Sequence, residues 1–424
     1  MLDIRFIVEN PDVVRKAARD KNMEVDVDRL LAIYQEVKAL TSQADSLRGE
    51  RNSLSREIPK LEGAAKQEGI LRVRELKDKI SEIEGRLAAV KEEYDELMLL
   101  VPSVPLPEVP VGKDEADNVE LRRVGEVPEF PFPFKDHLEL AEALDIVDVP
   151  RAVEMAGTRS FILKNAGALL EMAVTRFVID KLIAKGYTLL TVPVLVRERA
   201  MMGTGYFPLG RDQAYAIPED ELYLVGTSEV PMVSYHMDEI LSYRDLPLRY
   251  TALSTCFRRE AGTYGKDTRG LYRVHQFQKV EQVIFCPAEA EVAANLHNEL
   301  LQNVEEILQE LELPYRVALA CTGEIGAGQV LKHEVETWMP SRGAYCETHS
   351  CSTLNDYQSR RLNIKYRDSD GKSKFCYTLN NTGIASPRIL IPLLENHQQE
   401  DGSVNIPKVL WPYMNGMKKL TPQR

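Results

Sequence analysis

The chain has 424 residues, of which 44% are hydrophobic and 28% charged, and these proportions are ordinary for a globular protein of two or three domains. A net charge of −12 excludes a polycation that grips nucleic acid through bulk charge, so an RNA partner would have to be held by local basic patches. No stretch approaches the roughly 18 apolar residues that span a bilayer, and Met1 to Asn10 lacks the pattern of a secretory signal. We therefore expect a cytoplasmic protein with no membrane partner.

The six cysteines are scattered and form no CxxC pair, which indicates reduced thiols in a reducing compartment. Cys346, His349 and Cys351 are close enough in sequence to bind zinc together. Because no second pair of ligands follows at the spacing of a zinc finger, buried thiols are the simpler interpretation, and we expect no zinc.

Residues 1–100 are predicted to form a helical domain. Asn10-Pro11-Asp12 is a typical helix start. Apolar residues are then spaced by four and three along residues 33–61 and again along 73–97, which predicts two long helices. Gly63 and Gly69 bracket the reversal between them, so residues 27–100 are expected to form an antiparallel coiled-coil hairpin that reaches on the order of 45 Å.

The heptads of this hairpin do not say what it is for. By themselves they favour a dimerising or spacing coiled coil. Basic residues gather toward the tip, which favours an end that contacts phosphates, although acidic residues lie among them. These basic residues are Arg48, Arg51, Arg56, Lys60, Arg72, Arg74, Lys77 and Lys79.

Prolines recur from Val101 to Pro133 and interrupt helix and sheet alike, so residues 101–130 are interpreted as a linker before a second domain at 131–424. In that domain a helix is predicted from about Gly167 to Lys185, followed by the strand YTLLTVPVLV. Residues 288–313 have the pattern of an amphipathic scaffold helix.

The segment LVGTSEVP at 224–231 follows a predicted strand. A carboxylate beside two hydroxyls, at Thr227, Ser228 and Glu229, can hold an ammonium group. The hydroxyls fit the cap of a following helix equally well.

The stretch from Cys256 to Glu281 predicts two antiparallel strands joined by the glycine-bearing loop AGTYGKDTRG. Its arginines and lysines, among them Lys266 and Arg269 in the loop, would form a cationic floor with one acidic corner. Arginine forks on rigid strands suit phosphate groups, and Phe277 offers a face for a purine ring. A solvated charged hairpin is the alternative.

Two later segments carry groups of related chemistry. Glu347 and Ser350 are hard oxygen donors of the kind that Mg²⁺ prefers, although a solvated strand end explains them as well. Arg388 follows Ser386-Pro387 and precedes an apolar helix, so a helix start and a guanidinium would point toward the same anion.

The order of these segments resembles a known family. FRREAG, a loop and then RGLYRVHQFQKVE resemble motif 2 of class II aminoacyl-tRNA synthetases, and specifically that of the seryl-tRNA synthetases. The helix and strand at 167–196 resemble motif 1, and YTLNNTGIASPRILIPLLENHQ at 377–398 resembles motif 3. In motif 3, Asn381 and Pro387 stand where one common form of the pattern has glycine.

The resemblance implies a class II α+β fold: an antiparallel sheet flanked by helices, behind an N-terminal helical hairpin. It implies a homodimer that joins serine to ATP as seryl-adenylate and then transfers the seryl group to tRNA(Ser), which the hairpin embraces. Charging of tRNA(Sec) is left open. The cofactors implied are ATP, as a substrate, and Mg²⁺.

The resemblance also implies roles for individual residues. Arg258, Arg388 and Glu281 would be catalytic. Serine would be bound by Thr227, Glu229, Arg258, Glu281, Asn380 and Thr382. ATP would be bound by Arg258, Glu260, Arg273, Val274, Phe277, Glu347, Ser350 and Arg388, with Mg²⁺ on Glu347 and Ser350.

Two other hypotheses fit the same chain. One is a relative that loads serine onto a carrier protein, against which the basic-tipped arm argues. The other is a synthetase-like binding protein without catalysis, against which the presence of Arg258, Glu281 and Arg388 argues.

Overall fold

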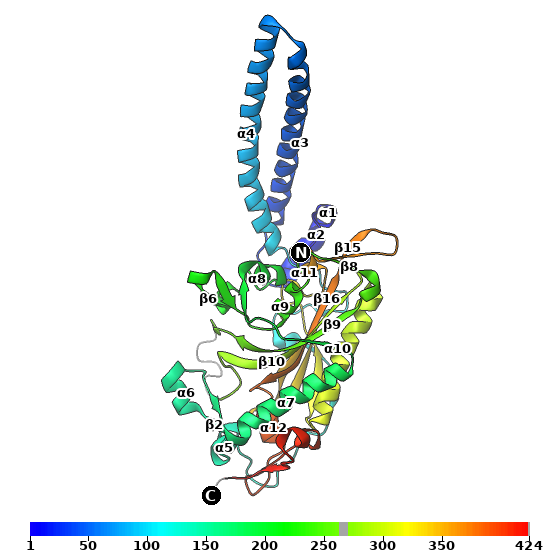
Figure 1. The fold of residues 1–424 in the computed structure, drawn as a ribbon. Coiled ribbons are helices and arrows are strands. Elements are labelled where there is room, and N and C mark those ends of the chain that lie inside the picture. The colour runs from blue at the N-terminus through cyan, green and yellow to red at the C-terminus, as the bar shows by residue number, and fades with distance from the viewer. Residues whose placement is uncertain (263–269, 423–424) are drawn as a thin grey trace. The chain divides into compact units, whose positions relative to one another are not determined.

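The computed structural model describes residues 1–262 and 270–422, which fall into two compact units, Leu2–Pro102 and Ser103–Arg424 (Figure 1). Within the described ranges, every helix is too short or too polar to span a lipid bilayer. All six cysteines are free thiols.

The smaller unit is helical, and its last two helices fold back on each other as the predicted coiled-coil hairpin. Asp26 caps the first long helix by accepting a hydrogen bond from the Arg29 backbone at 2.8 Å. Ion pairs such as Arg29 to Glu93 and Arg48 to Glu84 cross between the two helices and fix their antiparallel register. The elements are α1 (Ile4–Glu9), α2 (Pro11–Asp20), α3 (Val27–Glu57), the short 3₁₀ helix η1 (Ile58–Lys60) and α4 (Gly63–Leu100).

The reversal of the hairpin lies earlier in the chain than predicted. It occupies residues 58–62, where Pro59 ends the regular hydrogen bonding of α3, and α4 already begins at Gly63. Gly69 is therefore a buried helical residue and not a turn residue. A Cβ atom at this position would lie 3.1 Å from the Ile58 side chain, so the glycine lets the tip pack closely.

The larger unit is built on an eight-stranded sheet in which all neighbouring strands are antiparallel except the last pair, β9 and β4. The strand order is β1 (Val119–Val124), β11 (Tyr315–Leu319), β12 (Leu331–Met339), β13 (Ala344–Asn355), β16 (Tyr377–Ser386), β10 (Gln276–Cys286), β9 (Leu248–Phe257) and β4 (Thr188–Leu190).

Two long helices, α7 (Asn165–Ala184) and α10 (Ala290–Glu310), cover one face of this sheet (Figure 1). Both were predicted, and the core between helices and sheet contains Phe177 and Val304 packed with Val280 and Leu379. Because side chains alternate along a strand, the residues between these apolar positions point to the opposite face. That opposite face carries polar residues such as Lys279 and Glu281 on β10.

Shorter elements complete the larger unit. Its other helices are α5 (His137–Ala143), α6 (Val149–Ala156), α8 (Glu198–Thr204), α9 (Glu229–Ser234), α11 (Tyr357–Leu362) and α12 (Leu390–Asn396), with 3₁₀ turns η2 (Glu115–Asp117), η3 (Arg211–Gln213), η4 (Pro218–Asp220), η5 (Tyr243–Asp245), η6 (Pro340–Arg342) and η7 (Lys408–Met414). Its small sheets pair β2 (Val147–Asp148) with β3 (Ile162–Leu163), β5 (Leu195–Arg197) and β6 (Tyr215–Ile217) with β7 (Leu222–Leu224), β8 (Ile240–Ser242) and β15 (Ser373–Phe375) with β14 (Lys365–Arg367), and β17 (Val404–Asn405) with β18 (Lys419–Leu420).

The predicted linker at 101–130 differs from the structure, because the larger unit begins at Ser103. The Ser103 and Leu106 backbone N–H groups, which lie between prolines, donate to the carbonyls of Ala327 and Val330. Residues 119–124 contain no proline and form β1, the edge strand that pairs with β11. The segment from Ser103 on therefore belongs to the larger unit, and residues 119–124 belong to its sheet.

Candidate active site

The polar face of the large sheet forms the floor of a cavity of about 900 Å³. Strand alternation builds this floor: Phe277, Lys279 and Glu281 from β10 line the cavity together, as do Asn380 and Thr382 from β16. Glu281 and Thr382 are directly opposite each other across the two strands. The floor continues over β13 and β12, where Ser350 and Ser352 face Glu334 and Lys332.

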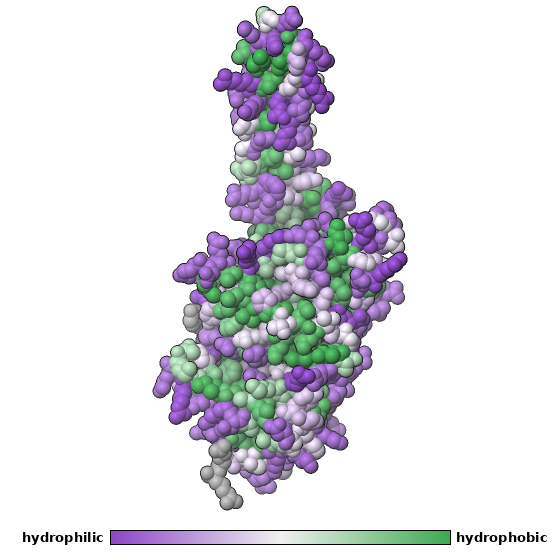
Figure 2. Space-filling view, viewed as in Figure 1, coloured by the Kyte–Doolittle hydropathy of each residue, from purple (hydrophilic) through white to green (hydrophobic). Residues whose placement is uncertain are grey.

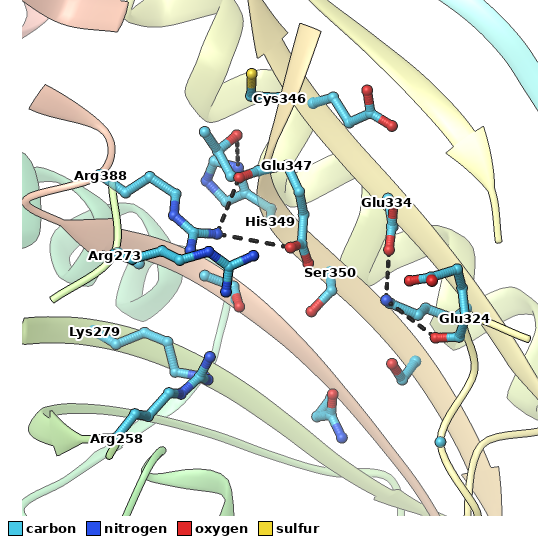
Figure 3. Close-up of a pocket in the computed structure, with 18 of the residues that line it drawn as sticks. Arg258, Arg273, Lys279, Glu324, Glu334, Cys346, Glu347, His349, Ser350 and Arg388 are labelled. Atoms are coloured by element: carbon cyan, nitrogen blue, oxygen red, sulfur yellow. Dashed lines mark hydrogen bonds and ion pairs between the residues drawn. The ribbon is translucent and has the colours of Figure 1, made fainter. Parts of the chain in front are cut away.

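One side of the cavity is cationic and the other acidic (Figure 3). Arg258, Arg273, Lys279 and Arg388 lie on the first side, while Glu324, Glu334 and Glu347 lie across from them. The guanidinium of Arg388 stacks on Tyr272, 4.3 Å from the ring centroid, and donates to the Glu347 carbonyl at 3.1 Å. These contacts aim a fixed positive charge at the middle of the cavity.

Charges around Glu347 and Lys332 keep both of them ionised. Burial acts to raise the pKa of Glu347, but Lys332, Arg388 and the other arginines outweigh it and hold that pKa below its usual value. Burial likewise opposes the charge of Lys332, yet Glu347 and Glu334 raise its pKa. The centre of the cavity therefore holds the ionised Glu347 carboxylate among several cations.

The end of the cavity near α9 holds two buried carboxylates, Glu229 and Glu281. Glu281 is 2% exposed and is paired with Lys279. Glu229 accepts hydrogen bonds from Tyr206, Gln358 and Asn380 at 3.1, 2.7 and 2.8 Å. Burial first, and then the charge of Glu281, raise the pKa of Glu229. A small cation that reached this corner would be stabilised by both groups.

The cavity brings together every predicted site residue except one. It is lined by Glu229, Arg258, Glu260, Arg273, Val274, Phe277, Glu281, Glu347, Ser350, Asn380, Thr382 and Arg388. Thr227 is fully buried and lies behind this lining, where its hydroxyl donates to Glu281 at 3.3 Å and accepts the Glu229 backbone N–H at 3.2 Å. It therefore supports the two carboxylates and does not face the cavity itself.

Four of the predicted residues, Glu260, Arg273, Arg258 and Phe277, have partners that the sequence did not indicate. Glu260 lies within ion-pair distance of Arg273 and Arg159, at 3.3 and 3.8 Å. The Arg258 guanidinium lies 5.2 Å from the centroid of the Phe277 ring, so it covers one side of the proposed stacking face.

The departures of motif 3 from the glycine pattern have different consequences. The Asn381 side chain does not line the cavity and donates to the Leu300 carbonyl of α10 at 2.7 Å. Pro387 lines the cavity beside Arg388 and follows a cis peptide bond.

The sequence motifs did not indicate the lining residues Tyr206, Lys332 and Glu334. Lys279, which was expected in the cationic floor, lines the cavity, because its spacing of two from Phe277 and Glu281 places it on the same face of a strand. Lys332 and Glu334 alternate in the same way along β12, but no motif marks them as functional.

The residues for a zinc site do not converge. Cys346 lines the cavity. The Cys351 side chain points to the opposite face of the sheet, where its sulfur lies 3.8 Å from Nδ1 of His297 on α10. For Mg²⁺ the ionised Glu347 and the nearby Ser350 hydroxyl fit as ligands, since this ion takes few carboxylates and completes its shell with water and phosphate oxygens. Among the residues described, no group of three or more His, Cys, Asp and Glu forms a metal cage.

Comparisons with known proteins agree with this arrangement. Residues 215–397 match the family model of the class II tRNA synthetase core domain (G, H, P, S and T), and residues 1–105 match that of the seryl-tRNA synthetase N-terminal domain. A serine–tRNA ligase from Deinococcus radiodurans is 47% identical over 420 residues, 99% of this chain and 99% of that protein. The crystal structure of seryl-tRNA synthetase from Pyrococcus horikoshii complexed with ATP covers both chains completely, with a TM-score of 0.92 at 38% identity.

The chain belongs to the seryl-tRNA synthetase family.

As a seryl-tRNA synthetase it is a class II aminoacyl-tRNA synthetase, and therefore a ligase, which confirms the predicted family, fold class and enzyme class. The motif 2 strands of this synthetase are β9 and β10, which pair antiparallel as predicted. Most of the loop between them, residues 263–269 with Lys266 and Arg269, lies outside the described residues.

Proposed function

We propose that this cavity performs the two-step reaction of a serine–tRNA ligase. The serine carboxylate attacks the α-phosphate of ATP, which gives seryl-adenylate and releases pyrophosphate. A hydroxyl at the 3′ end of tRNA(Ser) then takes the seryl group, and AMP leaves. The observation that carries the proposal is the division of one cavity into a corner with two buried carboxylates and a wall of arginines.

The arginine wall is suited to phosphate. Arg258, beside Phe277 and close to the carboxylate corner, would bind the α-phosphate and the serine carboxylate. Arg388 and Arg273 would bind the distal phosphates, and Phe277, Val274 and Glu260 would contact the adenosine. Because the groups are fixed before the reaction, they stabilise the charge that develops at phosphorus without reorganising.

Mg²⁺ would be bound by Glu347 and Ser350, and would neutralise phosphate charge during adenylate formation. Glu347 is kept ionised by the surrounding cations, as a metal ligand has to be.

The carboxylate corner is suited to serine. Glu229 and Glu281 would bind the ammonium group, and Glu281 with Thr382 and Asn380 would contact the side-chain hydroxyl. Alanine lacks that hydroxyl and would leave these buried polar groups unpaired, which disfavours it strongly.

For the tRNA partner, the coiled-coil hairpin of α3 and α4 is the proposed contact. Several of its basic side chains are engaged by the arm itself, such as Arg72, which pairs with Glu50 and Glu75. Arg56, Arg74, Lys77 and Lys79 are exposed and form no ion pair with any described residue, so they are the best placed to meet phosphates. This interpretation favours tRNA over a carrier protein as the acceptor.

A homodimer is proposed on the face of the larger unit that carries α7, β4 and β9. Met172, Leu189 and Leu253, one from each element, expose 67%, 43% and 37% of their surface. Figure 2 shows hydrophobic residues at the surface of the larger unit on the side where α7 lies. An apolar patch over adjoining elements is typical of a subunit interface.

Serine-dependent exchange of labelled pyrophosphate into ATP tests the proposed chemistry. We expect exchange with serine and Mg²⁺, and at least about a hundredfold less with alanine. Equal exchange with alanine would contradict the proposed contacts to the hydroxyl, and no exchange with any amino acid would favour a binding protein without catalysis.

A further inference from the structure

The carboxylate of Glu229 is held by a buried amide behind the cavity. Gln358, on the short helix α11, is 0% exposed and does not line the cavity. Its Nε2 donates to Glu229 Oε1 at 2.7 Å and to the Thr204 carbonyl at 3.1 Å. Gln358 therefore acts on Glu229 without reaching a molecule bound in front of it.

The orientation of this amide is itself fixed by a second buried residue. The hydroxyl of Thr378, on β16, donates to Gln358 Oε1 at 2.7 Å. Both partners of Nε2 are acceptors, so a flipped amide would place its oxygen against two other oxygens and lose both of these hydrogen bonds. The hydrogen bonds from Thr378 to Gln358 and from Gln358 to Glu229 therefore fix one orientation of the Gln358 amide.

The two oxygens of Glu229 are used differently. Oε1 accepts from Gln358 and from Asn380, whereas Oε2 accepts a single hydrogen bond, from Tyr206, among the residues described. Two donors on one oxygen fix the rotation of the carboxylate and leave Oε2 with capacity for another donor. Because Glu229 lines the cavity, that remaining capacity is available to a bound ammonium group.

We propose that Gln358, oriented by Thr378, is a positioning residue that sets the affinity for serine by holding the Glu229 carboxylate in place. The proposal rests on the proposed function, in which Glu229 binds the serine ammonium. It assigns Gln358 no contact with ATP, whose proposed groups lie along the arginine wall.

The chain offers a matched control for this test. Gln398 is also buried, at 4% exposed, and its amide also makes three hydrogen bonds, two with the Lys135 backbone and one to the Glu395 carbonyl. It does not line the cavity. Gln358→Met and Gln398→Met therefore remove the same amide and the same number of bonds, and differ in whether Glu229 is the partner.

The experiment measures KM for serine and for ATP by pyrophosphate exchange, together with the thermal unfolding midpoint, in full-length variants. Gln358→Met is expected to raise the serine KM about tenfold or more, because a buried hydrogen bond to a charged group is removed, with the ATP KM changed by less than about twofold. Gln398→Met should change neither KM, although both variants lose stability.

Thr378 provides a second, milder test. Thr378→Val keeps the shape but removes the hydroxyl, so the serine KM should rise about threefold to tenfold, while Thr378→Ser should retain the original value. If Gln358→Met does not fold, this pair decides the question alone.

The results distinguish the role of Gln358 from the proposed function of the chain. An unchanged serine KM in Gln358→Met or Thr378→Val, or equal rises in the serine and ATP KM, would overturn the role of Gln358 while the unmodified chain stays active. Absence of serine-dependent exchange in the unmodified chain would overturn the proposed function as well.

Discussion

Glu281 lies where three neighbours meet: Lys279 pairs with it, Thr227 donates to it, and Thr382 is opposite on the next strand. A carboxylate held in this way is ready to accept an ammonium group and a hydroxyl without moving. In the proposed mechanism it contributes to serine recognition more than to ATP binding.

Glu281→Ala should therefore raise the serine KM by about a hundredfold, the order expected when a buried charged partner is removed. The affinity for ATP, measured by calorimetry without serine, should change far less. Glu299→Ala, which removes a carboxylate paired with Arg249 at 2.8 Å, serves as the control. Comparable losses of serine activation and ATP binding would show that Glu281 does not have this role.

Most of the predicted site residues line one cavity, because they belong to ordered motifs on β10, β13 and β16 and on the segments beside them. The sequence could not show which of these side chains face the cavity. Thr227 and Glu229 are two positions apart, yet one lies behind the cavity lining and the other within it. Gln358 comes from a helix with no recognisable motif and meets Glu229 only through the tertiary fold.

At the scale of elements, α10 and the sheet enclose a pair of histidines. His297 and His333 share a hydrogen bond of 2.8 Å, and His297 also contacts Thr353 at 2.8 Å, with the Cys351 thiol nearby. Burial, followed by the charge of His333, lowers the pKa of His297 from 6.5 to about 3, and burial lowers that of His333 to about 4. Both are neutral in the fold.

This environment predicts acid sensitivity with a definite sign. Between about pH 6.5 and pH 3 the unfolded chain binds a proton at His297 that the folded chain does not, so the stability falls as the pH falls. Each such histidine contributes about 1.4 kcal/mol per pH unit. Urea unfolding at pH 6, 5.5 and 5 should show a slope smaller by about that amount in His297→Gln. An unchanged slope would contradict the prediction.

The arm is the second element that carries a prediction. Arg56, Arg74, Lys77 and Lys79 are exposed without ion pairs to described residues, whereas Arg48 is engaged by Asp45 and Glu84. Replacing the first four by serine should weaken tRNA binding and reduce the slope of log affinity against log salt by about 0.7 to 0.9 for each phosphate that the arm no longer neutralises. Serine-dependent pyrophosphate exchange should be unaffected.

Arg48→Ser is the matched control for the arm and should have a smaller effect on the salt slope. If the fourfold variant binds tRNA with the original salt dependence, the arm does not contact phosphates through these residues.

Element boundaries were harder to predict than elements. The heptad spacing located both helices of the arm. Gly63 and Gly69 suggested a turn between them, but the turn lies earlier, at Pro59. Prolines on both sides also concealed β1 in the sequence. Its partners on β11 lie more than 190 positions away in the chain and do not appear in a local pattern.

At the scale of the whole molecule, the apolar face of α7, β4 and β9 predicts a dimer. Leu189→Asp combined with Leu253→Asp places charges on that face, and sedimentation should report monomers where the unmodified chain gives dimers. Leu121→Asp on β1, at the opposite edge of the sheet and 45% exposed, is the control that should leave the mass unchanged. A dimer that persists in the double variant would place the interface elsewhere.

In the proposed function, one chain forms seryl-adenylate in its larger unit and uses its arm to bring in tRNA. The most direct test is the transfer of labelled serine to unfractionated tRNA, with ATP and Mg²⁺, by the full chain and by a variant in which a short linker replaces residues 34–98. We predict that the full chain charges tRNA and that the shortened chain retains pyrophosphate exchange but loses charging. A full chain that makes seryl-adenylate yet charges no tRNA would contradict the proposed function and favour transfer to another carrier.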